Sequence, residues 1–356
     1  MAGKRQVWIG LALSAVALGL AMPWKDMPQV WVSLEQGQWQ WLLLALPLYL
    51  VGYWSRARRV AQLLEPIKPV PTGRVLPALV IGFLFNNILP GRLGELIFAH
   101  LLGRREGISR TASFAVVVLS RILDGITIVA FFLFGLFTFL QVGGETGGST
   151  VDLAGHVFSR ADLLGKVYLA GIGGAILFGL VSTACFLLIA WQDLAMRVLD
   201  KLLVLLPQRL SARGRHVLEK FIAGLGILKN PGLLFAVFVF NFVPWGLELF
   251  TYYFGAHVFG LDLTVRECAL IMGMTNLAMI APSMPGGIGL FEGGGMIVMA
   301  LLGVEKATGF AYIVMIHLLI MLPINLWGAW FLWREGISFQ DALHSGDEPS
   351  VKRRHG

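Results

Sequence analysis

Two stretches of this chain place a Pro-Gly pair, a second Gly and a Glu inside apolar sequence. The first reads N-N-I-L-P-G-R-L-G-E from Asn86 to Glu95, and the second reads A-P-S-M-P-G-G-I-G-L-F-E from Ala281 to Glu292. Pro and Gly interrupt helices, and in hydrocarbon an interrupted backbone is tolerated only where protein or water surrounds it. Such interruptions in both halves of a membrane chain indicate a transport site.

Two arginines near the first interruption could bind an anion. Arg92 lies within it and Arg121 lies in the next apolar run. A guanidinium binds two phosphate oxygens at once, and unpaired backbone N–H groups at helix ends also favour an anion. We therefore predict a substrate-binding site that uses Arg92, Arg121, Asn87, Gly91, Gly286 and Gly287. The alternative for Arg121 is a structural ion pair with Asp124, because residues three apart share a helix face.

Five further ionisable side chains could balance charge or exchange protons during transport. Each costs about 2.5–3.5 kcal/mol inside a span and so requires a partner or a function. The glutamates that close the two Pro-Gly stretches could instead cap the half-helices that follow them, and the glutamate of G-L-E-L-F could pair with Arg92 or Arg121. By internal symmetry, the histidine of the last span is the counterpart of Arg121. These five residues are Glu95, Asp124, Glu248, Glu292 and His317.

Sequence signatures of catalytic and metal sites are missing. The seven histidines are scattered and the two cysteines, Cys185 and Cys268, are far apart, so we expect no bound metal and no cofactor. The chain has no Walker sequence, no G-x-S-x-G and no H-E-x-x-H. No soluble segment is long enough for a catalytic domain, and we expect the chain not to be an enzyme. The alternative is a membrane transferase acting on a lipid-linked substrate, with Asp124 or Glu292 as its base.

The composition is that of a polytopic membrane protein. The 356 residues are 56% hydrophobic and 14% charged, whereas soluble domains carry about 25% charged residues. The net charge of +7 is expected to reflect cytoplasmic loops and contact with anionic lipid rather than binding to nucleic acid.

Six stretches are long and apolar enough to be predicted as full spans, for which roughly 20 residues are needed. They are Val7 to Met22, Trp39 to Trp54, Ala112 to Leu140, Leu164 to Trp191, Leu233 to His257 and Gly309 to Trp333. Basic residues mark cytoplasmic segments. They are Lys4 and Arg5, the group Arg56, Arg58 and Arg59, the group Arg104, Arg105 and Arg110, and the C-terminal tail. Both termini are therefore expected in the cytoplasm.

This charge pattern places each broken stretch as a hairpin that enters and leaves on one side. The predicted fold is an all-α polytopic membrane protein with six full transmembrane helices plus two re-entrant helical hairpins, arranged as an inverted repeat. The alternative is two short full spans for each broken stretch, which gives ten crossings. The predicted parts are a first repeat at 1–140 with hairpin 75–103, an outer loop at 141–163, a second repeat at 164–333 with cytoplasmic interfacial segment 192–231 and hairpin 268–303, and a cytoplasmic tail at 334–356.

The chain resembles the family of lysylphosphatidylglycerol synthase transmembrane (flippase-type) domains. The resemblance lies in the motifs from Asn87 to Glu95, from Arg121 to Asp124 and from Met284 to Glu292. The chain departs from the family pattern at Ser120, where an acidic residue is often found, and at His317, where an arginine is often expected. We also expect no soluble aminoacyl-transferase domain, so the substrate need not be lysyl-lipid.

The resemblance and the paired motifs together imply a lipid translocase of the cytoplasmic (inner) membrane. It would move an anionic or phosphate-bearing lipid by alternating access, with that lipid as its main partner and with no nucleic-acid partner. The alternative is a non-transporting membrane partner of a lipid-modifying enzyme.

Overall fold

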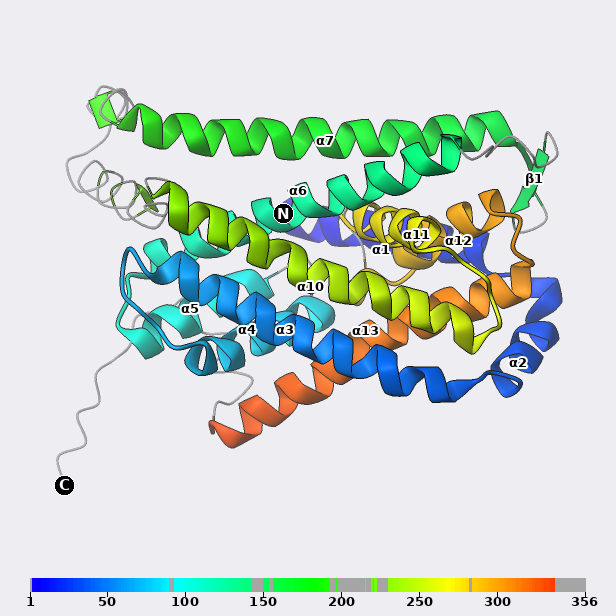
Figure 1. Ribbon diagram of the computed structural model, residues 1–356, viewed down its shortest axis with the longest axis horizontal. Helices are drawn as coiled ribbons and strands as arrows, with labels where there is room; N and C mark the ends of the chain where they lie inside the picture. The colour runs from blue at the N-terminus through cyan, green and yellow to red at the C-terminus, as the bar shows by residue number, and fades with distance from the viewer. Residues whose placement is uncertain are drawn as a thin grey trace.

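A computed structural model describes most of the chain as one long helical bundle (Figure 1). The described residues are 2–89, 93–141, 150–153, 156–192, 196–197, 215, 219, 221–222, 230–281 and 284–336. The tail from 337 onward and most of the predicted interfacial segment 192–231 therefore lie outside the described residues, as does most of the predicted outer loop before Thr150.

The helices that the structure describes have the following bounds: α1 (Ala2–Ala21), η1 (Trp24–Asp26), α2 (Met27–Glu35), η2 (Trp39–Trp41), α3 (Leu42–Leu64), α4 (Thr72–Ile88), α5 (Gly94–Glu106), α6 (Arg110–Gln141), α7 (Arg160–Ala190), α10 (Pro231–Val258), α11 (Val265–Ala278), η5 (Pro285–Gly287), α12 (Leu290–Leu301) and α13 (Lys306–Arg334). Two short strands, β1 (Thr150–Leu153) and β2 (His156–Ser159), pair antiparallel with Thr150 opposite Ser159. The predicted helical class is thus confirmed, and the β-hairpin is a small addition at one end of the bundle.

Four of the described helices are long and apolar enough to cross a membrane, namely α6, α10, α13 and the Arg160–Cys185 part of α7. Large apolar side chains project outward from them, for example Leu180 of α7, Phe235 of α10 and Leu326 of α13, each more than 60% exposed. Apolar surface of this extent would be unfavourable in water but suits a helix that faces lipid.

Helix α3 differs from its prediction. The second span was expected to end at Trp54, with Arg56, Arg58 and Arg59 in a cytoplasmic segment after it, but the helix continues to Leu64. Arg56 and Arg59 lie inside this helix and are buried, at 4% and 0% exposure. The predicted end at Trp54 was wrong because both arginines have anionic partners within the bundle, so their burial is compensated.

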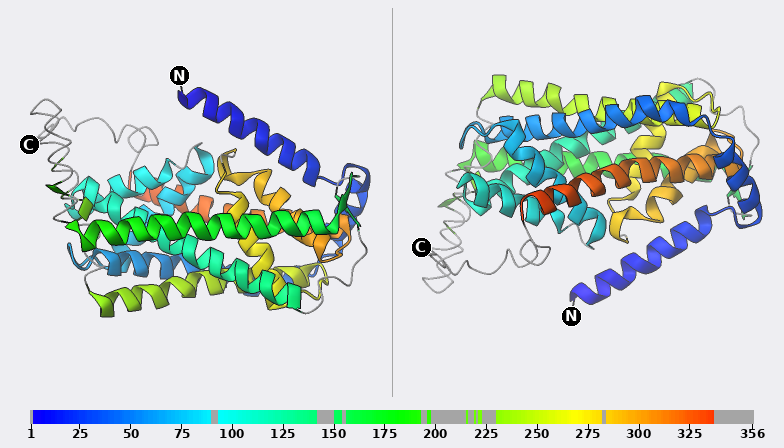
Figure 2. Two further views of the ribbon diagram at one scale, coloured as in Figure 1. Left: turned by 90° about the horizontal axis from the view of Figure 1, so that it is seen from above. Right: turned by 90° about the horizontal axis from the view of Figure 1, so that it is seen from below.

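Both predicted helix interruptions are present. The first separates α4 from α5 and the second separates α11 from α12. In the second, Gly286 and Gly289 have φ of 72° and 90°, which non-glycine residues rarely adopt. The two helix pairs lie toward opposite ends of the bundle, and their interruptions meet near its middle (Figure 2). A Cβ added at Gly286 would lie 3.5 Å from the carbonyl oxygen of Asn87.

The apolar core forms two clusters along the bundle. One is built around α10, α11, α12 and α13 and includes Tyr252, Phe291 and Tyr312, whereas the other is built around α3, α4, α5 and the first half of α6. Helix α6 passes from one cluster to the other between Leu123 and Val129, and α10 does so between Val237 and Trp245. Asp124 and Asn241 lie in these two crossing segments, where buried polar groups come together.

Candidate functional site

Asp124 of α6 and Arg59 of α3 form a buried ion pair at the centre of the bundle. Arg59 donates from Nη1 to Asp124 Oδ1 at 2.6 Å and from Nη2 to Oδ2 at 3.2 Å, and Nη2 also donates to Ser120 Oγ at 2.6 Å. Asn241 Oδ1 accepts a further bond from Nη1, and Trp245 Nε1 donates to Asp124 Oδ1 at 2.9 Å. A bidentate pair with satisfied neighbours is the arrangement in which a buried guanidinium is tolerated.

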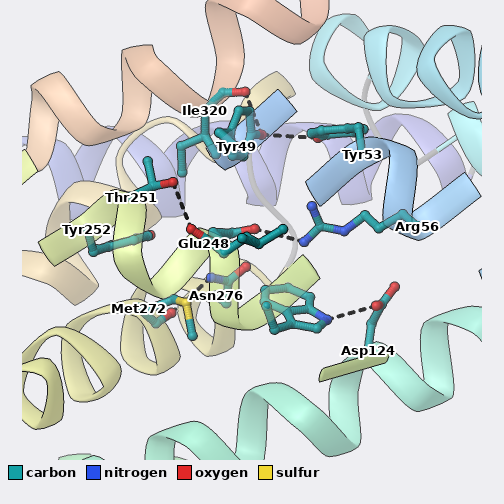
Figure 3. A network of polar contacts seen from close by, with 12 residues as sticks. Tyr49, Tyr53, Arg56, Asp124, Glu248, Thr251, Tyr252, Met272, Asn276 and Ile320 are labelled. Carbon is teal, nitrogen blue, oxygen red and sulfur yellow. Dashed lines mark hydrogen bonds and ion pairs between the residues drawn. The ribbon is translucent and has the colours of Figure 1, made fainter. Parts of the chain in front are cut away.

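A second buried ion pair lies beside the first. Arg56 Nη2 donates to Glu248 Oε2 at 2.8 Å, and the side chains are only 5% and 6% exposed (Figure 3). The Arg56 guanidinium also lies over the rings of Tyr53 and Trp245, with its Cζ 5.2 Å and 4.8 Å from the ring centroids. Among the described residues Glu248 therefore pairs with Arg56, so the predicted alternative of a pair with Arg121 is wrong.

Arg121 is the guanidinium of this group that is partly accessible. Its Nη1 lies 3.2 Å from Asp124 Oδ2, its Nε lies 3.6 Å from Glu95 Oε1, and its Cζ lies 4.9 Å from the centroid of the Phe83 ring. The side chains of Arg121 and Glu95 are 24% and 22% exposed, against 0% for Arg59. Because 3.6 Å is too long for a hydrogen bond, Glu95 holds Arg121 by charge alone.

Asp124 thus receives donors from two arginines and one tryptophan, and we call Asp124 with Arg59, Arg121 and Trp245 the Asp124 hub. The predicted Arg121–Asp124 ion pair is present within it. Three guanidiniums, from Arg56, Arg59 and Arg121, face three carboxylates, from Asp124, Glu248 and Glu95. The charges of these described groups balance, so an anion that binds Arg121 has to compete with Glu95.

The second interruption holds a separate buried pair, Glu292 of α12 and His317 of α13. Glu292 Oε2 accepts from Gly289 N at 2.6 Å, so this glutamate caps α12 as the alternative in the sequence analysis proposed. Its Oε1 lies 2.6 Å from His317 Nδ1, and His317 Nε2 lies 2.9 Å from the carbonyl oxygen of Gly286. The ring of Phe291 stacks on the imidazole with centroids 4.1 Å apart.

The structure brings the predicted site residues together in two groups rather than one. Arg121, Glu95 and Asp124 form the first group, and Glu292, His317 and Gly286 form the second, with Gly287 buried beside it. Asn87 Nδ2 donates to Asn325 Oδ1 of α13 at 2.8 Å and so joins the first helix pair to the last span. The predicted substrate-binding residues Gly91 and Arg92 lie outside the described residues.

Arg56 and Arg59 are the important residues that the sequence reasoning missed. A signal was available: Tyr49, Tyr53 and Arg56 recur at spacings of four and three, which places them on one helix face. Four of the five residues after Arg59 are also apolar, V-A-Q-L-L from Val60 to Leu64, so the helix had no reason to end at Trp54.

Comparison with known proteins identifies the family of this chain. The family model described as the lysylphosphatidylglycerol synthase TM region matches residues 7–328. The chain belongs to this family. Together with the apolar helices, this membership makes the chain a multi-pass membrane protein. No solved structure matches it.

Two similar proteins are UPF0104 membrane proteins of archaea. One, from Methanothermobacter thermautotrophicus, is 23% identical over 273 residues, which cover 71% of this chain and 73% of the relative. Another, from Pyrococcus horikoshii, is 24% identical over 306 residues, which cover 84% of this chain and 87% of the relative.

A third relative corrects one expectation. Glycosyltransferase AglD of Haloferax volcanii is 24% identical over 331 residues, which cover 86% of this chain. The match spans about half of that relative, 51% of its length. The expectation that the chain is not an enzyme is contradicted by this relative, whose name is that of a transferase. The absence of catalytic motifs was a poor guide because such motifs cover only a few reaction types.

Proposed function

We propose that this protein is a flippase-like lipid translocase, which moves an anionic or phosphate-bearing lipid across the cytoplasmic membrane by alternating access. The observation that carries the proposal is the position of Arg121. Its side chain is 24% exposed next to the first helix interruption and is held by Glu95 without a hydrogen bond. The family name refers to a phospholipid product, which supports a lipid as the substrate.

We propose that the two helix pairs are re-entrant hairpins between six full spans, with both termini in the cytoplasm. The lengths of α4, α5, α11 and α12 support this topology: they have 17, 13, 14 and 12 residues, and a crossing needs about 20. Labelling of Gly303→Cys from outside intact cells tests the orientation. Labelling that requires broken cells would contradict it.

The inverted repeat is supported by reciprocal packing. Helix α6 of the first repeat packs on α11 of the second, α13 of the second packs on α4 of the first, and the corresponding helices α3 and α10 pack on each other. A two-fold relation produces such exchanged contacts. The acidic residues agree, since Glu95 lies next to Arg121 and Glu292 next to His317 in equivalent positions of the two halves.

In this proposal the phosphate of a lipid headgroup replaces Glu95 at Arg121. A phosphate offers hydrogen bonds at about 2.7–2.9 Å to a guanidinium, which are stronger than the 3.6 Å contact with Glu95. Asp124 stays bound to Arg59 and Trp245 during this exchange and keeps the Arg121 side chain oriented. The role of Glu95 is to neutralise Arg121 when no lipid is bound.

The test uses vesicles that contain the purified protein and phosphatidylglycerol with a fluorescent label on the acyl chain. An added reductant that cannot cross the membrane destroys the label in the outer leaflet, so further loss reports lipid movement. We expect Arg121→Ala to lose most of the movement, and Arg121→Lys to retain part of it because the charge remains. The matched control is Arg74→Ala, whose side chain is 70% exposed at the start of α4. Movement at the wild-type rate in Arg121→Ala would refute the proposed role.

A transferase reaction on a lipid-linked substrate is the second candidate, and it is favoured by the name of the Haloferax relative. In that case Asp124 or Glu292 would act as the base. Incubation of the purified protein with membrane lipids and a sugar nucleotide, followed by mass spectrometry, tests it. A glycosylated lipid product that disappears in Asp124→Asn or Glu292→Gln would support the transferase, and the absence of any product would exclude it for the sugars used.

A further inference from the structure

The hydrogen-bond partners of Glu292 and His317 determine how many hydrogen atoms the pair carries. Both side chains are only 7% exposed, so the protein atoms around them are their main partners. The imidazole has one acceptor at each nitrogen: the Gly286 carbonyl oxygen lies 2.9 Å from Nε2, and Glu292 Oε1 lies 2.6 Å from Nδ1. The other oxygen of Glu292 is already used, because it accepts from Gly289 N at 2.6 Å.

A carbonyl oxygen can only accept, so Nε2 must carry a hydrogen. A second hydrogen must lie between Nδ1 and Oε1, because two lone pairs that face each other at 2.6 Å would repel. This hydrogen belongs either to an imidazolium or to a neutral carboxylic acid. Either way, the geometry contains one proton more than a neutral histidine beside an ionised glutamate.

We propose that Glu292 and His317 form a proton-binding site that fastens the second helix interruption to α13, and that loss of the proton releases the interruption. The link from this event to lipid movement rests on the proposed translocase function. The proton leaves Nε2 for water, and the pair remains as a neutral imidazole, with its hydrogen on Nδ1, beside the Glu292 carboxylate. No other bond is formed or broken.

The release follows from the number of donors. A neutral imidazole has one N–H, so it can donate to Glu292 or to the Gly286 carbonyl but not to both. An ionised carboxylate is the stronger acceptor, so the remaining hydrogen stays on Nδ1, bonded to Glu292, and the hydrogen bond from Nε2 to the Gly286 carbonyl is lost. Gly286 lies next to Asn87 of the first helix pair, which means that the freed segment is the one where the two interruptions meet.

Other ionisable side chains near the pair are not the source of its additional proton. On the described parts of the elements packed against α12 and α13, Glu248 is the charged residue in the middle of a helix, and it is bound to Arg56 at 2.8 Å. The described side chains of α1, Leu11 to Ala21, include no charged group. The remaining charged residues and the remaining histidine on the described parts of these elements lie at or near element ends: Glu35, Arg74, Asp152, Arg160, Asp162, Lys166, His257, Arg266, Glu267, Lys306 and Arg334.

The experiment is hydrogen–deuterium exchange of residues 284–289 in detergent-solubilised protein across about pH 5–8. Gly287 N donates to the Met284 carbonyl at 3.0 Å within this segment, so its protection reports the local structure. After correction for intrinsic exchange, we expect wild-type protection to fall about tenfold or more toward alkaline pH. Protection of α11, measured in the same sample, should stay unchanged.

Glu292→Gln provides the critical comparison. Its amide keeps an acceptor for Gly289 N and gains an N–H for His317 Nδ1, so it imitates the protonated pair and should keep the segment protected at every pH. His257→Gln, on α10 and bound within its own helix to the Tyr253 carbonyl, is the matched control and should behave like wild type.

A wild-type segment whose protection follows α11 at every pH would overturn the proposal, even if Glu292→Gln fails to fold. A pH response that persists in Glu292→Gln, or that vanishes in His257→Gln, would also overturn it. The measurement requires no lipid movement, so failure of the translocase function in the Arg121 variants is distinguishable from failure of the proton site.

Discussion

Replacing Arg59 by methionine tests whether the Asp124 hub stabilises the bundle. Methionine retains much of the apolar stem but removes both bonds to Asp124 and the donors to Ser120 and Asn241. Removing one member of a buried ion pair costs about 3–5 kcal/mol because the other charge stays buried. Asp124 keeps Trp245 at 2.9 Å and Arg121 at 3.2 Å, so we expect the lower part of this range, about 3 kcal/mol.

The assay is the free energy of unfolding in mixed micelles, measured by titration with a denaturing detergent. Arg74→Met is the matched control. Its ion pair with Glu106 is exposed on one side and 3.8 Å long, so it should change stability by less than about 1 kcal/mol. An Arg59→Met protein as stable as wild type would refute the reasoning.

Two further predictions concern local structure. Glu305 caps α13: burial disfavours its charge, but the backbone N–H groups of Thr308 and Ala307 outweigh this and lower the pKa of the carboxyl below its ordinary value. A lowered pKa contributes stability above the ordinary value that is lost as pH falls through the lowered one. The stability advantage of wild type over Glu305→Gln should therefore shrink as the solution is acidified below about pH 4.5, the ordinary pKa, and an advantage independent of pH would contradict this account. Gly94→Ala should destabilise the protein by a few kcal/mol, since its Cβ would collide with the backbone of α4. The control Gly73→Ala should be tolerated, because a Cβ at Gly73 has nothing within 4 Å. Thermal unfolding that ranks the two variants in the opposite order would show that the close approach of α4 and α5 is absent.

The sequence predicted what depends on local chemistry. The helix interruptions follow from Pro and Gly, which act on their own backbone, and the Arg121–Asp124 pair follows from helical spacing alone. The cap that Glu292 provides is also local, because its partner Gly289 is three residues away. For these features the relevant physics lies within one or two turns of the chain.

The buried ion pairs were missed because their partners are distant in sequence. Arg56 and Glu248 are 192 residues apart, and Arg59 and Asp124 are 65 apart. A basic residue after an apolar run is common in cytoplasmic loops, and only the packing of α3 on α10 distinguishes that case from this one. Ser120 illustrates the same limit: as a departure from the family pattern it had no assigned role, whereas the fold makes it a ligand of Arg59.

The Asp124 hub also restricts how this protein can move. It joins α3, α6 and α10, which come from both proposed repeats, through bonds to a fully buried guanidinium. Rocking one repeat against the other would break the bonds that Arg59 and Asp124 make to Asn241 and Trp245. It would also separate Arg56 from Glu248 in a medium of low polarity, at a cost of several kcal/mol. The three helices are therefore best regarded as a static frame. Access from either side would then alternate by movement of two small segments, one at each helix interruption, while the frame stays in place.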